Sequence, residues 1–238
     1  MSSYDVGPDH RLTVPGLLRQ LHDTAQAHAA AFGFGYRGLL ERRQAWALAS
    51  IDLSLDREPP LGEADFEAAT AVHQAAGPVV LRDYRATDAE GRIFARGQSM
   101  WALIDLDTRR TAKPSDDLRD VLRAIATDEL GRGRLRRLRD AGGLPAHERR
   151  VVHLHDCDFN GHLNNVVTAG WLLDAVAGAG GRRALPAIGA LRLTYHRELF
   201  RGEVGLVGLA SDGTATRVEV RREDGALVAN AELTPRGE

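Results

Sequence analysis

The sequence predicts an α+β fold in which a buried helix wrapped by an antiparallel sheet occurs twice in tandem. Three observations lead to this fold class. A helical pattern followed by strand-like segments occurs in the first half and returns roughly 150 residues later. Turn sequences such as Asp212-Gly213 and Asp224-Gly225 join the strand-like segments, which favours antiparallel hairpins. The length of 238 residues suits two units of roughly 120 residues each.

The first predicted helix opens at Thr13-Val14-Pro15, a polar cap followed by a proline that the first turn of a helix tolerates. Apolar residues then recur at helical spacing up to Phe32, and glycines at 33 and 35 end the helix. Strand-like segments follow: residues 51–55 alternate in polarity, and residues 79–87 and 92–106 flank a predicted turn at 88–91. This half is therefore expected to contain one long helix and then about four antiparallel strands.

Domain boundaries follow from changes in composition. The first unit, residues 1–114, closes at Lys113-Pro114. Residues 115–147 are expected to form a linker with one short amphipathic helix, and the linker ends in the turn-rich sequence Gly142-Gly143-Leu144-Pro145. In the second unit, residues 148–238, a polar loop leads into a predicted helix whose only charge is Asp174, so we expect this helix to be buried on all sides. That helix spans 164–177, and strand-like segments follow it at 191–199, 203–209, 214–222 and 226–233.

Composition and charge exclude several classes of function. The chain has 31 Lys and Arg against 33 Asp and Glu, so it offers no overall basic field for nucleic acid and no polybasic membrane anchor. No window approaches the ~18 apolar residues of a membrane span, and residues 1–13 lack the apolar core of a signal peptide. A single cysteine, Cys157, excludes an intrachain disulfide and suits a reducing compartment. We therefore expect a cytoplasmic enzyme or ligand-binding protein.

The densest polar cluster, residues 153–165, lies immediately before the most apolar predicted helix. A helix N-terminus presents unpaired N–H groups that can hold an oxyanion. Asp158, Asn160 and His162 supply a carboxylate base, an orienting amide and a titratable imidazole within five residues. Helix capping is the alternative interpretation, and it is favoured for Asn164 or Asn165 taken alone. The whole cluster contains more polar groups than capping requires, so we predict a catalytic loop.

Metal binding and attack by a cysteine nucleophile are two other chemistries that residues of this loop could suggest. His153-x-His155 followed by Asp156 resembles a run of metal ligands, but the sequence offers few further ligands downstream, so we expect no metal and no cofactor. Cys157 lies between two aspartates, which disfavour a thiolate, so we expect it to be a structural residue rather than a nucleophile.

Residues 155–171 resemble the signature of the acyl-ACP thioesterases, the plant plastid enzymes that act on acyl carrier protein (ACP) thioesters, and their bacterial relatives. That family pairs an Asp-x-Asn-x-His-x-Asn-Asn loop with a Gly-Trp a few residues into the helix. The matching residues here are Asp158, Asn160, His162, Asn164, Asn165, Gly170 and Trp171. Similar segments in the first half are His28, 32–36, Trp46, 82–84 and 101–110. The resemblance spans nearly the whole chain.

The resemblance implies a tandem double hotdog fold and hydrolysis of fatty acyl-ACP to free fatty acid. Its catalytic residues carry over to Asp158, Asn160, His162 and Glu198. The alternation of polar and apolar residues from 191 to 198 is expected to continue a strand through Glu198. Plant members often have a cysteine after that glutamate; here Leu199 stands there, so water attack assisted by carboxylates and His162 is expected. Either Asp158 or Glu198 could activate the water.

The resemblance also implies that the first half houses the acyl chain. The first half keeps the helix but lacks the polar loop; the equivalent segment, residues 9–15, is expected to be catalytically degenerate. Phe32, Phe34 and Trp46, with the helix face around Leu17, are candidate pocket residues, and Asn164 and Trp171 are further candidates for substrate binding. For each of these residues, a place in the hotdog core is the alternative.

The arginine run at 132, 134, 136, 137 and 139 is a candidate docking site for an acidic ACP, with a solvated helix end as the alternative. Three rival functions stay open: an acyl-CoA thioesterase of the same fold, a hydratase acting on enoyl thioesters, and a non-catalytic acyl-binding protein. The intact polar loop argues against the last, because a binder needs no base. The sequence leaves open the acyl-chain length, the carrier and the oligomeric state, including a homodimer.

Overall fold

The computed structural model describes residues 2–130, 135–181 and 187–237. Four α-helices and two short 3-10 helices are assigned in these ranges: η1 Ser3–Asp5, α1 Val14–Ala31, α2 Tyr36–Leu40, α3 Asp116–Ile125, η2 Leu154–Asp156 and α4 Asn165–Ala179. The strands of the first half are β1 Gln44–Leu55, β2 Phe66–Ala76, β3 Val79–Asp88, β4 Ile93–Asp105 and β5 Arg110–Thr111. Those of the second half are β6 Ala146–Val151, β7 Ile188–Tyr195, β8 Val204–Ser211, β9 Thr216–Arg222 and β10 Leu227–Pro235.

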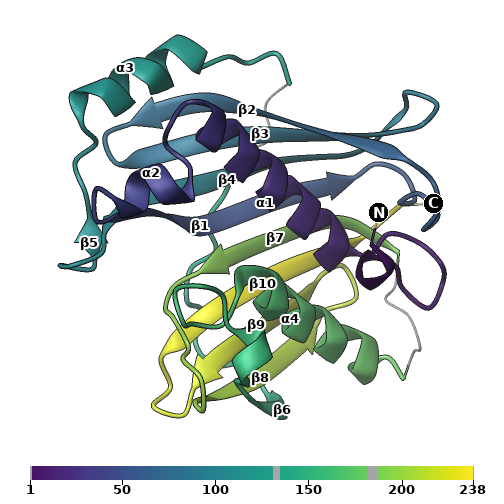
Figure 1. The fold of residues 1–238 in the computed structure, drawn as a ribbon. Coiled ribbons are helices and arrows are strands. Elements are labelled where there is room, and N and C mark those ends of the chain that lie inside the picture. Colours follow the sequence, from purple (N-terminus) through teal and green to yellow (C-terminus); the bar gives the residue numbers. More distant parts are fainter. Residues whose placement is uncertain (1, 131–134, 182–186, 238) are drawn as a thin grey trace.

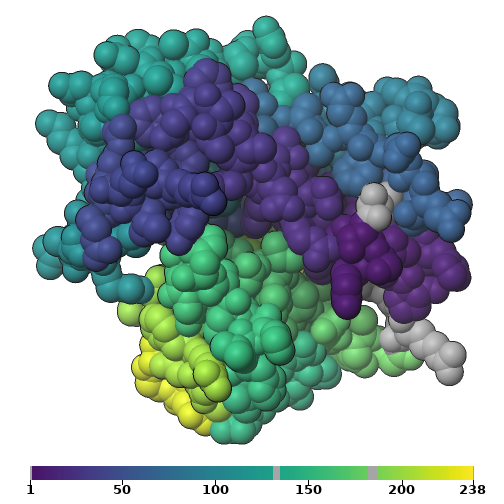
Figure 2. All heavy atoms as spheres, viewed as in Figure 1, coloured from purple at the N-terminus to yellow at the C-terminus, as the bar shows by residue number. Residues whose placement is uncertain are grey.

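All ten strands belong to one sheet with the order β2-β3-β4-β1-β7-β10-β9-β8-β6, and β5 pairs with β4. Strands β1 and β7 join the two halves, because Ser50–Ser54 pair antiparallel with residues 190–194. Helices α1 and α4 lie on the same face of this sheet, α1 over the first half and α4 over the second (Figure 1). In the space-filling view the two halves meet along a seam that crosses the molecule (Figure 2). One buried core cluster contains residues of both helices and both halves.

Helix α1 follows from its local sequence. The Thr13 hydroxyl accepts a hydrogen bond from the Gly16 N–H at 3.0 Å, and a proline stands in the first turn. Gly33, with φ of 80°, follows the last turn and ends the helix. The apolar face that the sequence predicted is buried, with Leu17 and Leu21 each 1% exposed. The position of the helix is confirmed.

Helix α4 begins where the sequence predicted, with Asn164 as its N-cap. The side chain of Asn164 accepts a hydrogen bond from the Val166 N–H at 2.7 Å. The prediction of burial on all sides is wrong, because Asp174 faces solvent and pairs with Arg150 at 3.1 Å. Most of the large apolar residues of the helix pack into the core, among them Trp171, Leu172, Leu173 and Val176.

The linker crosses the outer face of the second half, the face opposite α4. The Leu138 N–H donates to the Thr194 hydroxyl at 2.9 Å, and further on the Leu144 N–H donates to Glu219 at 2.8 Å. Between them the Asn230 side chain donates to the Arg139 carbonyl at 3.0 Å. Thr194, Asn230 and Glu219 lie opposite one another on the neighbouring strands β7, β10 and β9. The linker therefore runs across the strands towards β6.

Two expectations about the linker and the strands need correction. Residues 135–145 contain no helix, so the interpretation of the arginine run as a solvated helix end is wrong for its described part; Arg132 and Arg134 lie outside the described residues. Strands β2 and β6 had no counterpart in the sequence pattern. Both lie at the ends of the sheet order, where a strand pairs with only one neighbouring strand and a strict alternation of polarity is not required.

Two helices wrapped by one continuous antiparallel sheet form the tandem double hotdog fold that the sequence predicted. In the ranges that the structure covers, no helix is long and apolar enough to cross a membrane.

Gly97 provides a test of the β1–β4 contact on which the first half depends. A Cβ atom at Gly97 would lie 2.8 Å from the Asp52 carbonyl oxygen and would also clash with the Leu53 side chain. We expect Gly97→Ala to lower the free energy of unfolding by about 1–3 kcal/mol, because overpacking forces the backbone to move. Urea denaturation followed by tryptophan fluorescence measures this change.

Gly170→Ala is the matched control. A Cβ atom there has nothing within 4 Å, so in the interior of α4 we expect a gain of about 0.5–1 kcal/mol. Equal destabilisation by both substitutions would contradict the steric argument.

Candidate active site

The polar loop before α4 is a closed turn held by its own backbone. The Asp158 N–H donates to the His162 carbonyl and the Gly161 N–H donates to the Asp158 carbonyl, both at 3.0 Å. Gly161 has φ of 80°, a left-handed conformation that favours glycine. The loop is anchored at its end because the Asn164 N–H donates to the Asp156 carbonyl at 2.8 Å. Its catalytic candidates therefore project from a fixed backbone.

The imidazole of His162 lies between two carboxylates. Its Nδ1 is 3.8 Å from Oδ2 of Asp158, and its Nε2 is 3.6 Å from Oε1 of Glu198. Both distances exceed a normal hydrogen bond, as is common at catalytic sites before substrate binds. The structure thus brings together three of the residues named from the sequence, with one carboxylate on each side of a ring that can carry a proton.

Asn160 completes the loop beside Asp158. Its N–H donates to Oδ1 of Asp158 at 2.8 Å, and its side-chain amide lies 3.5 Å from the other carboxylate oxygen. The amide is exposed and free to turn towards a substrate. These contacts fix the orientation of the Asp158 carboxylate.

Glu198 reaches the site by a route that the sequence did not predict. Strand β7 ends at Tyr195, and the N–H groups of His196 and Arg197 both donate to the Val228 carbonyl, at 2.8 and 3.2 Å. This bulge interrupts the alternation of side chains. Without the bulge, Glu198 would share the outer face with Thr194, under the linker. The expectation of a regular strand through Glu198 is wrong, and the bulge turns the carboxylate towards His162.

Two contacts from the first half reach this site, and neither was predicted. The Arg109 guanidinium, in the turn between β4 and β5, contacts Glu198. The ring of Tyr36 in α2 packs against Phe159 of the catalytic loop, with ring centroids 4.2 Å apart. Both are long-range contacts between residues with no local sequence signal, so only the fold reveals them.

The site opens into a cleft of about 1020 Å³ between the halves. Strands β1 and β7 pair only from Ser50 to Ser54 on the β1 side, and the preceding part of β1 diverges from residues 195–199. The cleft lies where they diverge, and both strands line it together with α1 and the catalytic loop. Asn164, predicted to bind substrate, lines this cleft as well as capping α4.

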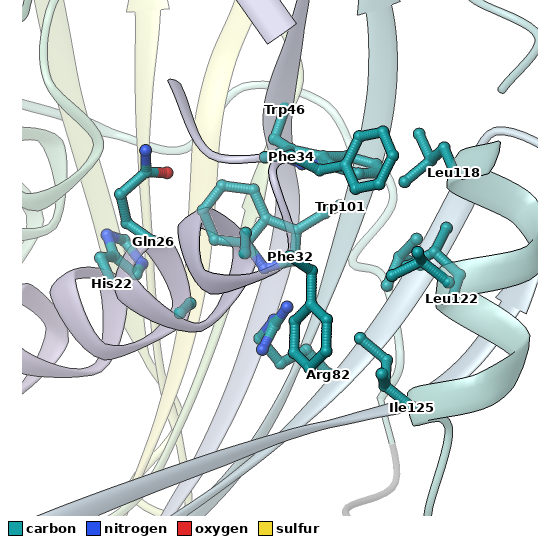
Figure 3. Close-up of a pocket in the computed structure, with 14 residues that line it drawn as sticks. His22, Gln26, Phe32, Phe34, Trp46, Arg82, Trp101, Leu118, Leu122 and Ile125 are labelled. Atoms are coloured by element: carbon teal, nitrogen blue, oxygen red, sulfur yellow. Dashed lines mark hydrogen bonds between the residues drawn. The ribbon is translucent and has the colours of Figure 1, made fainter. Parts of the chain in front are cut away.

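A smaller cavity of about 50 Å³ adjoins the cleft inside the first half. His22, Gln26, Trp46 and Trp101 line both spaces. Figure 3 shows Phe32, Phe34 and Trp46, the pocket residues proposed from the sequence, around this cavity, with Leu118, Leu122 and Ile125 of α3 closing it. The Leu17 face of α1 is instead buried in the core.

Arg82 lines this apolar cavity although it carries a charge. Its side chain is 6% exposed, and burial lowers the pKa of the guanidinium. Its Nη1 lies 3.2 Å from Nδ1 of His28 and donates to the Thr70 hydroxyl at 3.3 Å. No carboxylate in the described part of the chain pairs with it. The lining of the cavity is therefore apolar except for Arg82, His22 and Gln26.

Trp171 does not reach either space in the described structure. It is 6% exposed and packs in the core, where a Cβ atom added at Gly205 would lie 2.9 Å from its ring. The Arg150 guanidinium lies 5.8 Å from the ring centroid of Trp171. These contacts support a core role for this residue.

The first half contains a second copy of the loop backbone. The Gly7 N–H donates to the Arg11 carbonyl at 2.8 Å, as Asp158 does to His162, and the Thr13 N–H donates to the Asp5 carbonyl at 2.7 Å, as Asn164 does to Asp156. These pairs place Gly7 where the second half has Asp158 and Arg11 where it has His162. The loop keeps the shape but has no carboxylate at the Asp158 position and no imidazole at the His162 position; its Asp9 and His10 stand where the second half has Asn160 and Gly161. That it is catalytically degenerate stays a prediction.

The surroundings of the residues considered for metal binding and for nucleophilic attack are as follows in the structure. His153 and His155 lie at and within η2 rather than on a strand, and the His153 N–H donates to Oδ2 of Asp156 at 2.7 Å, a capping contact. The Sγ of Cys157 lies 3.5 Å from the His153 carbonyl, and the residue packs against the core. In the described ranges, no group of three or more His, Cys, Asp or Glu side chains is arranged to hold a metal ion.

Comparison with known proteins identifies the family. The model of the acyl-ACP thioesterase N-terminal domain matches residues 1–122, half of the chain. The chain belongs to the acyl-ACP thioesterase family.

Several curated relatives carry that name. The chloroplastic palmitoyl-acyl carrier protein thioesterase of Gossypium hirsutum is 25% identical over 257 aligned residues, covering 95% of this chain and 60% of that protein. The corresponding enzyme of Cuphea hookeriana is also 25% identical, covering 73% of this chain and 44% of that protein. The chain thus spans less than two thirds of the length of these relatives.

Solved structures share the fold over almost the whole chain. An acyl-ACP thioesterase from Bacteroides thetaiotaomicron superposes with a TM-score of 0.85 at 22% identity, covering 98% of this chain and 93% of that one. The 12:0-ACP thioesterase from Umbellularia californica gives 0.80 at 22% identity, covering 100% and 95%.

His22, which lines both the cleft and the cavity, should make the stability of the protein depend on pH. Burial lowers its pKa from 6.5 to about 4, so it is neutral in the folded protein near neutral pH. The unfolded chain therefore binds a proton more readily, and stability falls as the pH drops from 6.5 towards 4. We expect the wild type to lose up to about 3 kcal/mol more than His22→Gln over this range. Urea denaturation of both proteins at pH 7.5, 5.5 and 4.5 measures the difference; parallel pH curves would contradict it.

Proposed function

We propose that this protein hydrolyses the thioester of fatty acyl-ACP and releases a free fatty acid and the carrier thiol. The observation that carries the proposal is the placement of His162 between Asp158 and Glu198, in front of the N-terminus of α4 and beside a cleft that leads to an apolar cavity. Membership of the acyl-ACP thioesterase family supports the same reaction.

The chemistry follows from the groups present. The thioester carbonyl binds at the start of α4, where N–H groups without helical partners stabilise the developing oxyanion; one such donor is typically worth about 3 kcal/mol. A water molecule attacks the carbonyl carbon as a carboxylate takes its proton. The tetrahedral intermediate then collapses, the carbon–sulfur bond breaks, and the departing thiolate takes up the proton that the carboxyl group holds, which restores the carboxylate. His162 and Asn160 orient the water and the substrate.

Two carboxylates can act as the base. Asp158 is half-buried and held by Asn160, whereas Glu198 is 40% exposed and held by Arg109. Comparison of Asp158→Asn with Glu198→Gln assigns the roles, because loss of the base lowers kcat more than loss of an orienting group.

The acyl chain extends from the cleft into the first half in this proposal. Trp46 and Trp101 line both spaces, so a chain that passes them enters the cavity walled by Phe32 and Phe34. Asn164 lies at the thioester end. The apolar lining suits a hydrocarbon chain.

An acidic carrier protein and a cytoplasmic location complete the proposal. Arg136, Arg137 and Arg139 are exposed on the linker, and Arg137 also lines the cleft. Guanidinium groups at the cleft suit a carrier whose surface is negative. The single cysteine suits the reducing cytoplasm.

Substitution of the central groups tests the proposal. We expect Asp158→Asn and His162→Ala each to lower kcat for acyl-ACP at least about 100-fold, because general acid–base groups contribute 10²–10⁴-fold. Neither side chain belongs to the apolar core, so thermal stability should change little. Thiol release from acyl-ACP substrates of varied chain length, followed with a thiol reagent, measures the rates.

Cys157→Ser is the matched control, because Cys157 is adjacent to Asp158 but disfavoured as a nucleophile. It should keep more than half of the activity, and dialysis against a chelator should leave the wild type active. Unchanged turnover in His162→Ala, or complete loss in Cys157→Ser, would place the chemistry elsewhere.

The linker arginines test the carrier. Neutralising Arg136 and Arg137 together should raise KM for acyl-ACP about threefold to tenfold at low salt and leave a short neutral thioester unaffected, because charge steers encounter with an anionic partner. The effect should fade with salt, as the Debye length falls from ~10 Å at 0.1 M to ~3 Å at 1 M. Identical salt dependence of variant and wild type would exclude docking at these residues.

A further inference from the structure

The candidate active site contains a side chain from the other half of the molecule. Glu198 is presented by the second half, and the guanidinium that contacts it belongs to Arg109 in the turn between β4 and β5 of the first half. We propose that Arg109 is the positioning residue that holds the Glu198 carboxylate beside His162. The inference rests on the proposed thioesterase function.

The contacts of Glu198 divide between two partners. One carboxylate oxygen, Oε2, contacts Nη2 of Arg109, and the other, Oε1, lies 3.6 Å from Nε2 of His162. Glu198 stands beyond the end of β7 and its side chain is 40% exposed, so the sheet does not fix its rotamer. In the described part of the chain, Arg109 is the guanidinium that pairs with it. An exposed glutamate without this contact would sample solvent-facing rotamers.

Arg109 is held in place by a turn with an unusual backbone. Its φ is 54°, in the left-handed region that few non-glycine residues adopt. The Asp105 carboxylate stabilises the turn by accepting hydrogen bonds from the Thr108 N–H at 2.7 Å and from its hydroxyl at 2.9 Å. These bonds lower the pKa of Asp105. The Arg109 N–H donates to the Asp105 carbonyl at 2.9 Å, so the strained residue is fixed at the turn itself.

Arg43, in the loop between α2 and β1, makes further contacts that support the turn. The Arg43 guanidinium donates to the Asp107 carboxylate, and the Leu106 N–H donates to the Arg43 carbonyl at 2.9 Å. Arg43 also has a left-handed φ of 54°. Two of the three non-glycine residues with positive φ in the described structure thus meet at this turn. Backbone strain is retained where surrounding contacts determine it, and it often marks a functional site.

The ring of Phe200 lies beside both Arg109 and the imidazole of His162. The Arg109 guanidinium carbon lies 6.0 Å from the centroid of the Phe200 ring, and that ring meets the His162 ring edge to face with centroids 6.5 Å apart. Arg109 therefore packs over the same ring that limits the movement of His162. Through Arg109, the first half therefore contacts Glu198 directly and the Phe200 ring beside His162.

A positioning role differs measurably from a role in docking the carrier. The test compares octanoyl-ACP with S-octanoyl-N-acetylcysteamine, a small neutral thioester that lacks the carrier. We expect Arg109→Gln to lower kcat about tenfold on both substrates with little change in KM. Arg109→Lys should recover part of the loss, and added guanidinium ions should partly rescue Arg109→Ala. Arg110→Gln, in the adjacent residue, is the matched control and should behave as wild type.

A double-mutant cycle with Glu198→Gln isolates the contact. If Arg109 acts through Glu198, adding Arg109→Gln to Glu198→Gln should change kcat less than twofold. Independent, multiplicative losses would overturn the proposal. So would an unchanged kcat in Arg109→Gln, or a loss confined to KM for octanoyl-ACP, which would make Arg109 a carrier contact.

A readout independent of turnover separates this inference from the proposed reaction. In wild-type protein, NMR should show a nuclear Overhauser effect between the Glu198 methylene protons and the His162 ring, and Arg109→Gln should lose it while the thermal midpoint stays within about 2 °C. Persistence of the effect in the variant would overturn the positioning role. A wild type that hydrolyses neither thioester would refute the proposed function, whereas the NMR result would still decide the role of Arg109.

Discussion

The pairing of β1 with β7 is the constraint on which the rest of the structure depends. It is limited to Ser50–Ser54 on the β1 side, yet it turns two five-stranded units into one ten-stranded sheet with a shared core. Because pairing stops there, the strands diverge and leave the cleft between them. The same join fixes the distance between the halves, so that a first-half guanidinium can meet a second-half carboxylate. Sheet register thus controls the geometry of the candidate site.

The two halves show how one backbone can serve different chemistry. Both contain a loop closed by equivalent backbone hydrogen bonds ahead of a capped helix. In the second half that loop presents Asp158 and His162; in the first, Gly7 and Arg11 occupy these positions, and Arg11 pairs with Glu58 at 2.7 Å. The first half instead has an apolar cavity beside its helix. In the proposed function, the division between chemistry in the second half and chain binding in the first follows from side chains, because the loop backbone is shared.

The elements that could be predicted from the sequence are those encoded by a local pattern of residues. The caps at Thr13 and Asn164, the two long helices and the polar loop all have signals within a few residues, and they stand where they were expected. Strands β2 and β6 were missed because edge strands need no strict alternation. The bulge after Tyr195 depends on a carbonyl of β10, so alternation along β7 could not reveal it. Arg109 is 89 residues from Glu198 in the chain, and no local pattern connects them.

The position of β6 has a consequence for behaviour at high concentration. At the other end of the sheet, β2 is flanked by main chain, since the Thr127 N–H donates to the Val72 carbonyl at 2.8 Å. Strand β6 is the opposite end and pairs with β8 alone among the described strands. Its central residues are Glu148, Arg149 and Arg150. Charged side chains on an edge strand oppose the edge-to-edge stacking through which sheets grow into aggregates. The charges on this edge strand thus disfavour growth of the sheet by addition of a further strand.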